Sequence, residues 1–165
     1  MTTLINENMI KKFRFRTEYN QFYIQDKEFN GEFDFDFWSD KNYDQRLAVS
    51  NGGLGVRTES YGIIKGELVI LSKSVSNIDL DKYDHIVEAS IEINGNELQI
   101  MDCPTNNIEV KIKLNNGKYR VRVYSSNLES VLESDLSNDT DDDYYRIEIW
   151  PDDNLELRVL KQYKM

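Results

Sequence analysis

The sequence predicts an all-β fold, an antiparallel β-sandwich of about ten strands with a jelly-roll-like arrangement. Apolar and polar side chains alternate with a period of two along most of the chain, which is typical of strands with one buried and one solvated face. Glycine, asparagine and proline interrupt these strands at short intervals, where turns require them. Only residues 127–137 have apolar residues at helical spacing, and that stretch is long enough for one or two turns.

The N-terminal part of the chain supplies the first strands. In residues 12–18, Phe13 and Phe15 fall on one face and arginines on the other, and residues 22–25 and 33–38 repeat the alternation. Two short strands are expected around Asn51-Gly52-Gly53, because the glycines supply the positive φ of a tight hairpin. The more continuously apolar residues 61–74 predict a strand covered on both faces.

The C-terminal part predicts three further strand pairs. Residues 85–102 give two strands around Asn94-Gly95, and residues 108–125 give the clearest hairpin of the chain, with its turn at Asn116-Gly117. Residues 144–150 and 155–163 form a last pair around the turn cluster at residues 151–154. In each case we expect the two strands to pair with each other.

The length of 165 residues fits one domain that spans residues 1–165 and buries its own core. The single cysteine excludes an intramolecular disulfide framework. The N-terminus has no apolar segment after a basic stretch, and no run approaches the roughly 20 apolar residues that cross a bilayer. We therefore expect a cytoplasmic protein.

The negative charge is concentrated in one segment. The formal charge is 20 − 30 = −10, and seven of the acidic residues lie between Glu129 and Asp143, where no lysine or arginine occurs. Such a field repels nucleic acid and anionic membranes, and it attracts basic proteins. The charge distribution thus predicts a basic protein partner, with neither nucleic acid nor a membrane as a partner.

No catalytic constellation is visible, so we expect a protein that is not an enzyme and needs no cofactor or metal. The only histidine, His85, opens a strand and is expected at the surface or a strand edge, while Cys103 is expected to be a buried or turn thiol. Phosphate-binding, nucleophile and zinc motifs are missing. Glu88, Glu92 and Glu148 are expected on a solvated sheet face, paired with arginines across the strands.

The acidic run at residues 139–143 begins like a calcium-binding loop. Asp139, Asp141 and Asp143 occupy the first, third and fifth positions of an EF-hand loop. Tyr144 and Trp150 then stand where that loop needs glycine and glutamate. Three interpretations are left, namely a weak calcium site, a solvated loop and a partner-binding surface.

The strand after the acidic run favours a partner-binding surface. Tyr144 and Trp150 share one face, opposite Tyr145, Ile147 and Ile149. If the latter face the core, Tyr144 is displayed beside the carboxylates, and exposed aromatics ringed by charges are typical interface anchors. The alternative is that Tyr144 and Trp150 only cover a sheet edge. The predicted partner-binding residues are Asp139, Asp141, Asp142, Asp143 and Tyr144.

Several short segments resemble, in order and spacing, the small nuclease-inhibitor family of the bacterial competence system. They are YNQFYIQD, FWSD, RLAVSNGGLGVRTE, NNGKYRVRVY and DDDYYRIEIWP. The resembling residues are Tyr19, Gln21, Phe22, Trp38, Ser39, Asp40, Ala48, Gly52, Gly117, Tyr119 and Tyr145. The resemblance implies a protein that pairs with a nuclease and blocks it, and it supplies no catalytic residue.

The sequence therefore predicts a non-enzymatic acidic binding protein of the inhibitor or immunity type. It would neutralise a basic nuclease or toxin by occluding its active cleft. The alternative is a sandwich that binds a small ligand or a carbohydrate, with Trp38, Tyr43, Tyr61 or Tyr124 as stacking platforms. An enzyme that uses carboxylates and a structural subunit are further alternatives, and the oligomeric state is left open.

Overall fold

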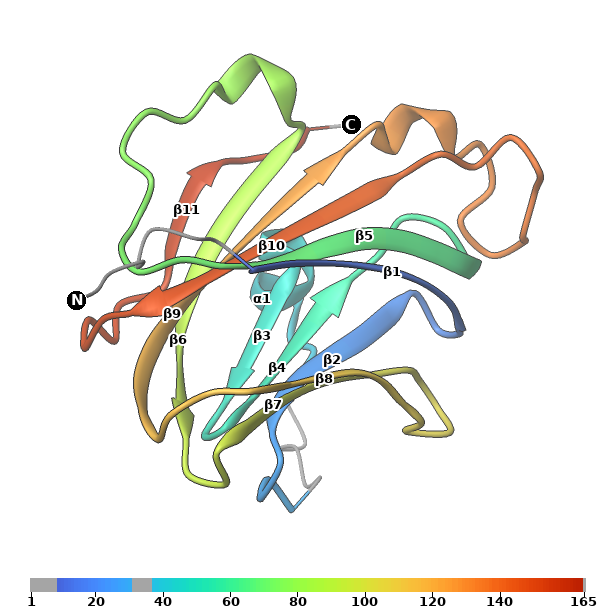
Figure 1. Ribbon diagram of the computed structural model, residues 1–165. Helices are drawn as coiled ribbons and strands as arrows, with labels where there is room; N and C mark the ends of the chain where they lie inside the picture. The colour runs from blue at the N-terminus through green and yellow to red at the C-terminus, as the bar shows by residue number, and fades with distance from the viewer. Residues whose placement is uncertain (1–8, 31–36, 165) are drawn as a thin grey trace.

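The structure is a computed structural model that describes residues 9–30 and 37–164. Figure 1 shows the order of the elements along the chain. They are β1 (Met9–Thr17), β2 (Gln21–Asp26), α1 (Asp40–Gln45), β3 (Leu47–Ser50), β4 (Gly53–Arg57), β5 (Gly62–Ile70), η1 (Leu80–Lys82), β6 (His85–Ile93), β7 (Glu97–Met101), β8 (Ile108–Lys113), β9 (Gly117–Ser126), η2 (Leu128–Ser130), β10 (Tyr144–Pro151) and β11 (Arg158–Lys161).

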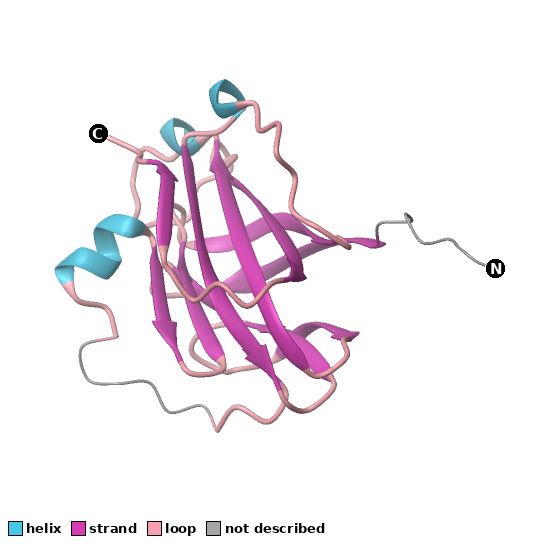
Figure 2. Cartoon of the chain, turned by 90° about the vertical axis from the view of Figure 1, so that its left-hand side faces the viewer, coloured by secondary structure: helices cyan, strands magenta, loops and turns pink. Residues whose placement is uncertain are grey.

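The strands form two sheets, which confirms the predicted β-sandwich. One sheet has six strands in the order β1-β5-β10-β9-β6-β11, and the other has five in the order β3-β4-β2-β7-β8. In Figure 2 the sheets lie in separate layers, and α1 lies to one side of them. The pairing is antiparallel with one exception among the described strands, because β10 pairs with β5 in parallel.

The core lies between the inner faces of the two sheets. Phe13, Phe15 and the fully buried Tyr145 pack around Phe22, with ring centroids 6.1, 5.9 and 6.1 Å from that of Phe22. The inner face of β9 adds Val121 and Val123. Full burial of each such side chain stabilises the fold by roughly 1.5–3 kcal/mol. The predicted inward and outward faces of these strands are therefore confirmed.

The three strand pairs predicted in the C-terminal part are wrong in their pairing. β6 lies in the six-stranded sheet and β7 in the five-stranded sheet, and the chain changes sheets again between β8 and β9. β11 pairs with β6 instead of β10. The turns occur where the sequence places them, but those at residues 94–95 and 116–117 connect the two sheets, and the one at residues 151–154 joins two strands of the six-stranded sheet that are not neighbours. Alternation defines which face of a strand is buried without defining which strand lies alongside.

The hairpin of β3 and β4 is confirmed. Ser50 pairs with Gly53 across the turn, and Gly52 has a φ of +83°. Gly53 belongs to β4, where an added Cβ would lie 3.1 Å from the ring of Phe29. One glycine therefore supplies the turn conformation, and the other allows a close approach of an aromatic ring.

β5 is covered on both faces only at its end, which corrects the prediction for residues 61–74. Ile63 is exposed, whereas Leu68 and Val69 are both buried. Val69 packs with Leu71 and Trp150 in a second, smaller cluster on the outer face of the six-stranded sheet. The segment after β5 folds back over that face and brings Val75 against the cluster.

The helical content is small, and the sequence pattern predicts only part of it. The sequence pattern did not indicate α1, which Ser39 caps by accepting a hydrogen bond from the backbone of Asn42 at 3.2 Å. The predicted helical turn within residues 127–137 is the single 3-10 turn η2, which buries Leu128. The alternation predicted for residues 33–38 lies mostly outside the described residues, although Phe37 is buried.

Candidate functional site

Residues 127–143, between β9 and β10, form what we call the acidic loop (orange, upper right in Figure 1). Five of its seven acidic side chains are exposed, namely Glu129, Glu133, Asp135, Asp139 and Asp142. Two leucines stand among these charges with most of their surface in solvent, Leu132 at 81% and Leu136 at 54%. Leu128, Val131 and Leu132 are the apolar residues that predict a helical turn within residues 127–137, but of the two leucines only Leu128 is buried.

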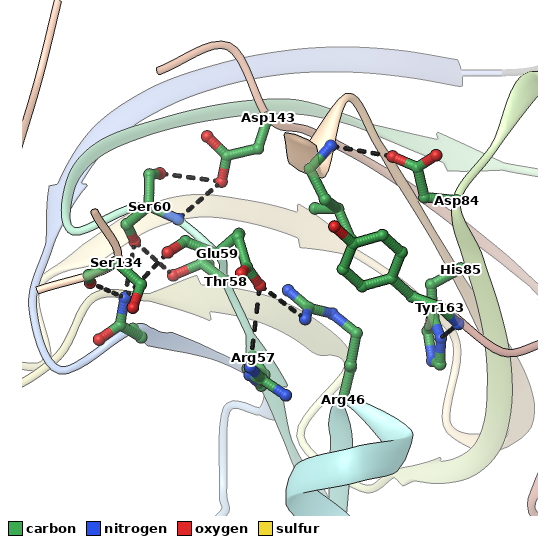
Figure 3. Close-up of polar contacts among 12 residues, drawn as sticks. Arg46, Arg57, Thr58, Glu59, Ser60, Asp84, His85, Ser134, Asp143 and Tyr163 are labelled. Carbon is green, nitrogen blue, oxygen red and sulfur yellow. Dashed lines mark hydrogen bonds and ion pairs between the residues drawn. The ribbon is translucent and has the colours of Figure 1, made fainter. Parts of the chain in front are cut away.

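The acidic loop is fastened to the body of the sandwich at its C-terminal end. Asp143 is buried, and its Oδ2 accepts hydrogen bonds from the backbone and the hydroxyl of Ser60 at 3.0 and 2.8 Å. The Tyr145 hydroxyl also donates to this oxygen. Figure 3 shows the Asp143 carboxylate turned toward Ser60. Asp143 is thus placed to hold the loop.

Further contacts hold the middle of the acidic loop. Asn20, in the turn between β1 and β2, donates from Nδ2 to the Ser134 carbonyl at 2.7 Å. Asn127 donates to the Asp142 carboxylate at 2.7 Å, and the Asp142 backbone donates to the Ser130 hydroxyl at 2.8 Å. These hydrogen bonds therefore give the loop a defined shape.

The other three aspartates of the predicted site lie nearer the surface. Asp139 is exposed, and Asp141 is half-buried with its Oδ2 accepting from the Asn138 backbone at 3.0 Å. Asp142 is exposed and forms an ion pair with Lys65, whose hydrogen bond and charge lower the Asp142 pKa. Of the predicted site, Asp139 and Asp142 are therefore the exposed aspartates, whereas Asp141 Oδ1 is buried and has no hydrogen-bond partner within the described residues.

The aromatic residues of β10 differ from the expectation. Tyr144 is half-buried, its hydroxyl donates to Glu67 Oε1 at 2.7 Å, and burial raises its pKa to about 12. Trp150 is only 3% exposed, beneath the segment that follows β5. The hypothesis that Trp150 is a displayed anchor is therefore wrong, and so is the alternative that it covers a sheet edge, because β10 lies between β5 and β9 in the sheet.

A buried network of charges crosses the outer face of the six-stranded sheet. Arg122 Nε lies 2.8 Å from Glu88 Oε2, and Arg146 Nη2 lies 3.0 Å from Glu148 Oε2. Arg120 approaches Glu88 at 3.4 Å. The predicted cross-strand pairing is confirmed, but Glu88 and Glu148 are buried, so the expected solvated face is wrong for them. Glu92, on the same strand as Glu88, is exposed as expected.

Two backbone segments cover this network. Arg122 donates to the Val75 carbonyl at 3.2 Å, and Arg120 donates to the Asn154 carbonyl at 2.9 Å. The two segments exclude water from the charged side chains. Buried charges need hydrogen-bonding partners, and the two backbone carbonyls supply them. The network has the geometry of a structural ion cluster, with each carboxylate held by arginines.

A pocket of about 440 Å³ lies beside Tyr144 on the same outer face. Tyr83, Tyr124 and Arg146 contribute to its lining, and the rings of Tyr83 and Tyr124 have centroids 4.6 Å apart. Of the four aromatics proposed as stacking platforms, Tyr124 lines this pocket. Trp38, Tyr43 and Tyr61 lie on other segments, so the four do not form one platform.

His85 opens β6 as predicted but is fully buried, which corrects its expected surface position. Its Nε2 lies 2.7 Å from the Gln45 carbonyl, and its Nδ1 accepts from the Tyr163 backbone at 3.0 Å. Because a carbonyl can only accept, Nε2 carries the proton. Burial lowers the His85 pKa to about 4, so a neutral imidazole joins α1 to the C-terminal segment. Figure 3 shows the His85 ring beside Tyr163.

Cys103 is buried, as predicted. Burial raises the pKa of its thiol, which disfavours the nucleophilic thiolate.

Within residues 9–30 and 37–164, no cluster of three or more histidine, cysteine, aspartate or glutamate side chains has the arrangement that a metal ion needs. The helices in this part of the chain are all too short or too polar to cross a membrane.

Comparison of the fold with solved structures gives two matches. ComJ from Bacillus subtilis, described as the inhibitor of the DNA-degrading activity of NucA, superposes with a TM-score of 0.65 at 16% identity, over 90% of this chain and 99% of ComJ. The chain shares the ComJ fold. The product of crocagin biosynthetic gene J matches with a TM-score of 0.57 at 14% identity, over 89% of this chain and 99% of that one.

The resemblance to the competence nuclease inhibitors is therefore confirmed at the level of the fold. No protein-family model matches the sequence, and no curated protein matches it. The similarity to ComJ lies in the arrangement of the strands across nearly the whole of both chains.

Proposed function

We propose that this chain is a non-enzymatic inhibitor that binds a basic nuclease or toxin through the acidic loop and occludes its active cleft. It acts in the cytoplasm on a protein partner, and neither nucleic acid nor a membrane is its target. The ComJ fold and the ComJ activity against NucA support the inhibitor class. The acidic loop supports a basic target, because clustered negative charge steers basic proteins toward itself.

The observation that carries the proposal is the exposure of Leu132 and Leu136 within an anchored acidic loop. Exposed apolar side chains ringed by charge are arranged like interface anchors, in which the apolar groups dock and the charges guide the approach. Asp143 and Ser60 fix the base of the loop, so the leucines and carboxylates are presented together. Such a surface fits a basic cleft with an apolar recess.

The first experiment tests the charges. A variant with Asp139→Asn, Asp141→Asn and Asp142→Asn is compared with a control of equal charge change, Glu92→Gln, Glu109→Gln and Asp153→Asn, whose side chains are exposed elsewhere. Association with NucA and with the product of the adjacent gene is measured from low to high salt. We expect the loop variant to associate about tenfold more slowly at low salt, with a smaller salt dependence. Rates equal to those of the control contradict the proposal.

The second experiment tests the leucines. Leu132→Ser and Leu136→Ser are compared with Leu155→Ser, which is 67% exposed outside the acidic loop. We expect the two loop variants to dissociate at least tenfold faster while their association rate stays unchanged, because docked apolar groups act mainly on dissociation. Dissociation as slow as that of Leu155→Ser removes the leucines from the interface.

The pocket beside Tyr144 favours a second candidate function, the binding of a small ligand or carbohydrate. The paired rings of Tyr83 and Tyr124 offer an aromatic wall, and Arg146 and Glu67 supply polar groups, the usual mixture in ligand sites. A glycan array and a thermal-shift screen test it. Hits that disappear in Tyr83→Ala support this function, and an absence of hits excludes it.

A further inference from the structure

Arg46 directs a guanidinium group into the interior at one end of the sandwich. Its backbone ends α1 in the left-handed conformation, with a φ of 62°, and its N–H bonds to the carbonyls of Asn42 and Tyr43. The residue is 2% exposed, and Nη1 lies 2.8 Å from Glu59 Oε1. Figure 3 shows the Arg46 side chain between Glu59 and Tyr163.

One edge of this guanidinium is free. Within the part of the chain that the structure describes, Arg46 Nε and Nη2 have no hydrogen-bond partner, although both are buried. These two nitrogens form the edge of the arginine fork that holds a carboxylate or a phosphate by two parallel hydrogen bonds. Buried donors without a partner cost stability, and an oxyanion on this edge would remove that cost.

A second arginine adds positive charge to the same place. Arg57 Nη2 lies 3.8 Å from the Glu59 oxygen that Arg46 contacts, so two guanidinium groups share one carboxylate. Arg57 also stacks on the ring of Tyr43, at 3.7 Å from the centroid. Burial and the charge of Arg46 both lower the Arg57 pKa. Arg46, Arg57 and Glu59 together carry a net charge of +1 around the free edge, and the exposed carboxylate of Asp44 in the pocket lining balances that charge over the pocket as a whole.

Both arginines line a pocket of about 410 Å³. Asp44, Gln162 and Tyr163 complete the lining, and the Tyr163 ring centroid lies 5.9 Å from the Arg46 guanidinium carbon. Tyr163 follows the last strand and is half-buried. Since Arg46 is nearly fully buried, a ligand that reaches its free edge must displace the side chains that cover it.

We propose that this pocket binds a small oxyanion, a carboxylate or a phosphate, on the Nε–Nη2 edge of Arg46 with Arg57 as the second cation. The site lies apart from the acidic loop and does not depend on the proposed inhibitor function. The oxyanion can belong to a free small molecule or to the side chain of a peptide. In both cases a carboxylate or phosphate group presents two oxygens to the Nε–Nη2 edge of Arg46.

The experiment titrates the protein with sodium acetate, sodium phosphate and a blocked peptide with one glutamate, against sodium chloride at matched ionic strength. The Arg46 Nε–H resonance and the melting temperature are followed. With one oxyanion at ten times its Kd, we expect that resonance to shift and Tm to rise by roughly 3–6 °C. If acetate or phosphate binds and the peptide does not, the site takes a small molecule. If only the peptide binds, the site takes a peptide side chain.

Variants separate the site from general charge effects. Arg57→Gln should reduce the affinity for the oxyanion at least tenfold, and Arg46→Lys should do the same, because an ammonium lacks the two-donor fork. Arg14→Gln, an exposed arginine on β1, should leave binding unchanged. The proposal is overturned if no oxyanion shifts the Arg46 resonance beyond the chloride control, or if Arg57→Gln binds as the wild type does. Folding of Arg57→Gln is checked by its melting curve without ligand.

Discussion

The backbone nitrogen of Ser60 lies 3.0 Å from Oδ2 of Asp143, and this bond joins the two sheets at the base of the acidic loop. Ser60 follows β4 of the five-stranded sheet, and Asp143 precedes β10 of the six-stranded sheet. Tyr145 strengthens the junction, because its hydroxyl donates to Asp143 and accepts from the Glu59 backbone at 2.7 Å. The position of the proposed binding loop thus depends on one buried carboxylate.

Replacing Asp143 by alanine should therefore destabilise the whole sandwich. The change leaves two donors of Ser60 and the hydroxyl of Tyr145 without their acceptor, and we expect a loss of about 3 kcal/mol in the free energy of unfolding. Urea denaturation measures it. Asp139→Ala, an exposed aspartate of the same loop, should change stability by less than about 0.5 kcal/mol. Equal stabilities of the two variants contradict this role of Asp143.

Glu88 and Glu92 offer a second matched pair, because both point to the outer face of β6. Glu88 is buried between Arg120 and Arg122, and Glu92 is exposed. Glu88→Ala leaves buried arginines without their carboxylate, so we expect a loss of about 3–5 kcal/mol. Glu92→Ala should have an effect below about 0.5 kcal/mol. Denaturant unfolding of both variants checks the difference, and a small loss in Glu88→Ala shows that the arginines find other partners.

The faces of the strands could be predicted from the sequence, whereas their neighbours could not. Alternation correctly buries Phe13, Phe15, Val121 and Val123, because a period of two depends only on the strand itself. The turn at Asn116-Gly117 is equally local, yet the strands on either side of it enter different sheets. Sheet membership depends on long-range packing between the layers, which leaves no mark in a short segment.

The candidate site shows the same limit. The charge of the acidic loop is visible in the sequence, and the exposed Asp139 and Asp142 were expected there. The burial of Asp143 depends on Ser60, which is 83 residues away along the chain. Arg46 gave no signal at all, because its burial results from α1 and the C-terminal segment meeting around it.

The pH dependence of stability should report on His85, the only histidine of the chain. Its pKa is lowered from 6.5 to about 4 in the folded state. Between pH 4 and 6.5 the imidazole is therefore mostly protonated in the unfolded chain and mostly neutral in the folded protein. The free energy of unfolding therefore falls as pH falls through this window, by about 3 kcal/mol in total for this group. Well above pH 6.5 the imidazole is neutral in both states and contributes no pH dependence.

The variant His85→Gln isolates this contribution. Glutamine stays neutral and can still donate to the Gln45 carbonyl, while the carboxylates titrate alike in both proteins. Urea denaturation of wild type and variant at several values between pH 4 and 7 gives the difference in stability. We expect the wild type to lose about 3 kcal/mol relative to the variant as pH falls from 7 to 4. A difference that stays constant shows that the imidazole takes up its proton as readily in the folded protein, and hence that the bond from the Tyr163 backbone to Nδ1 does not hold it neutral.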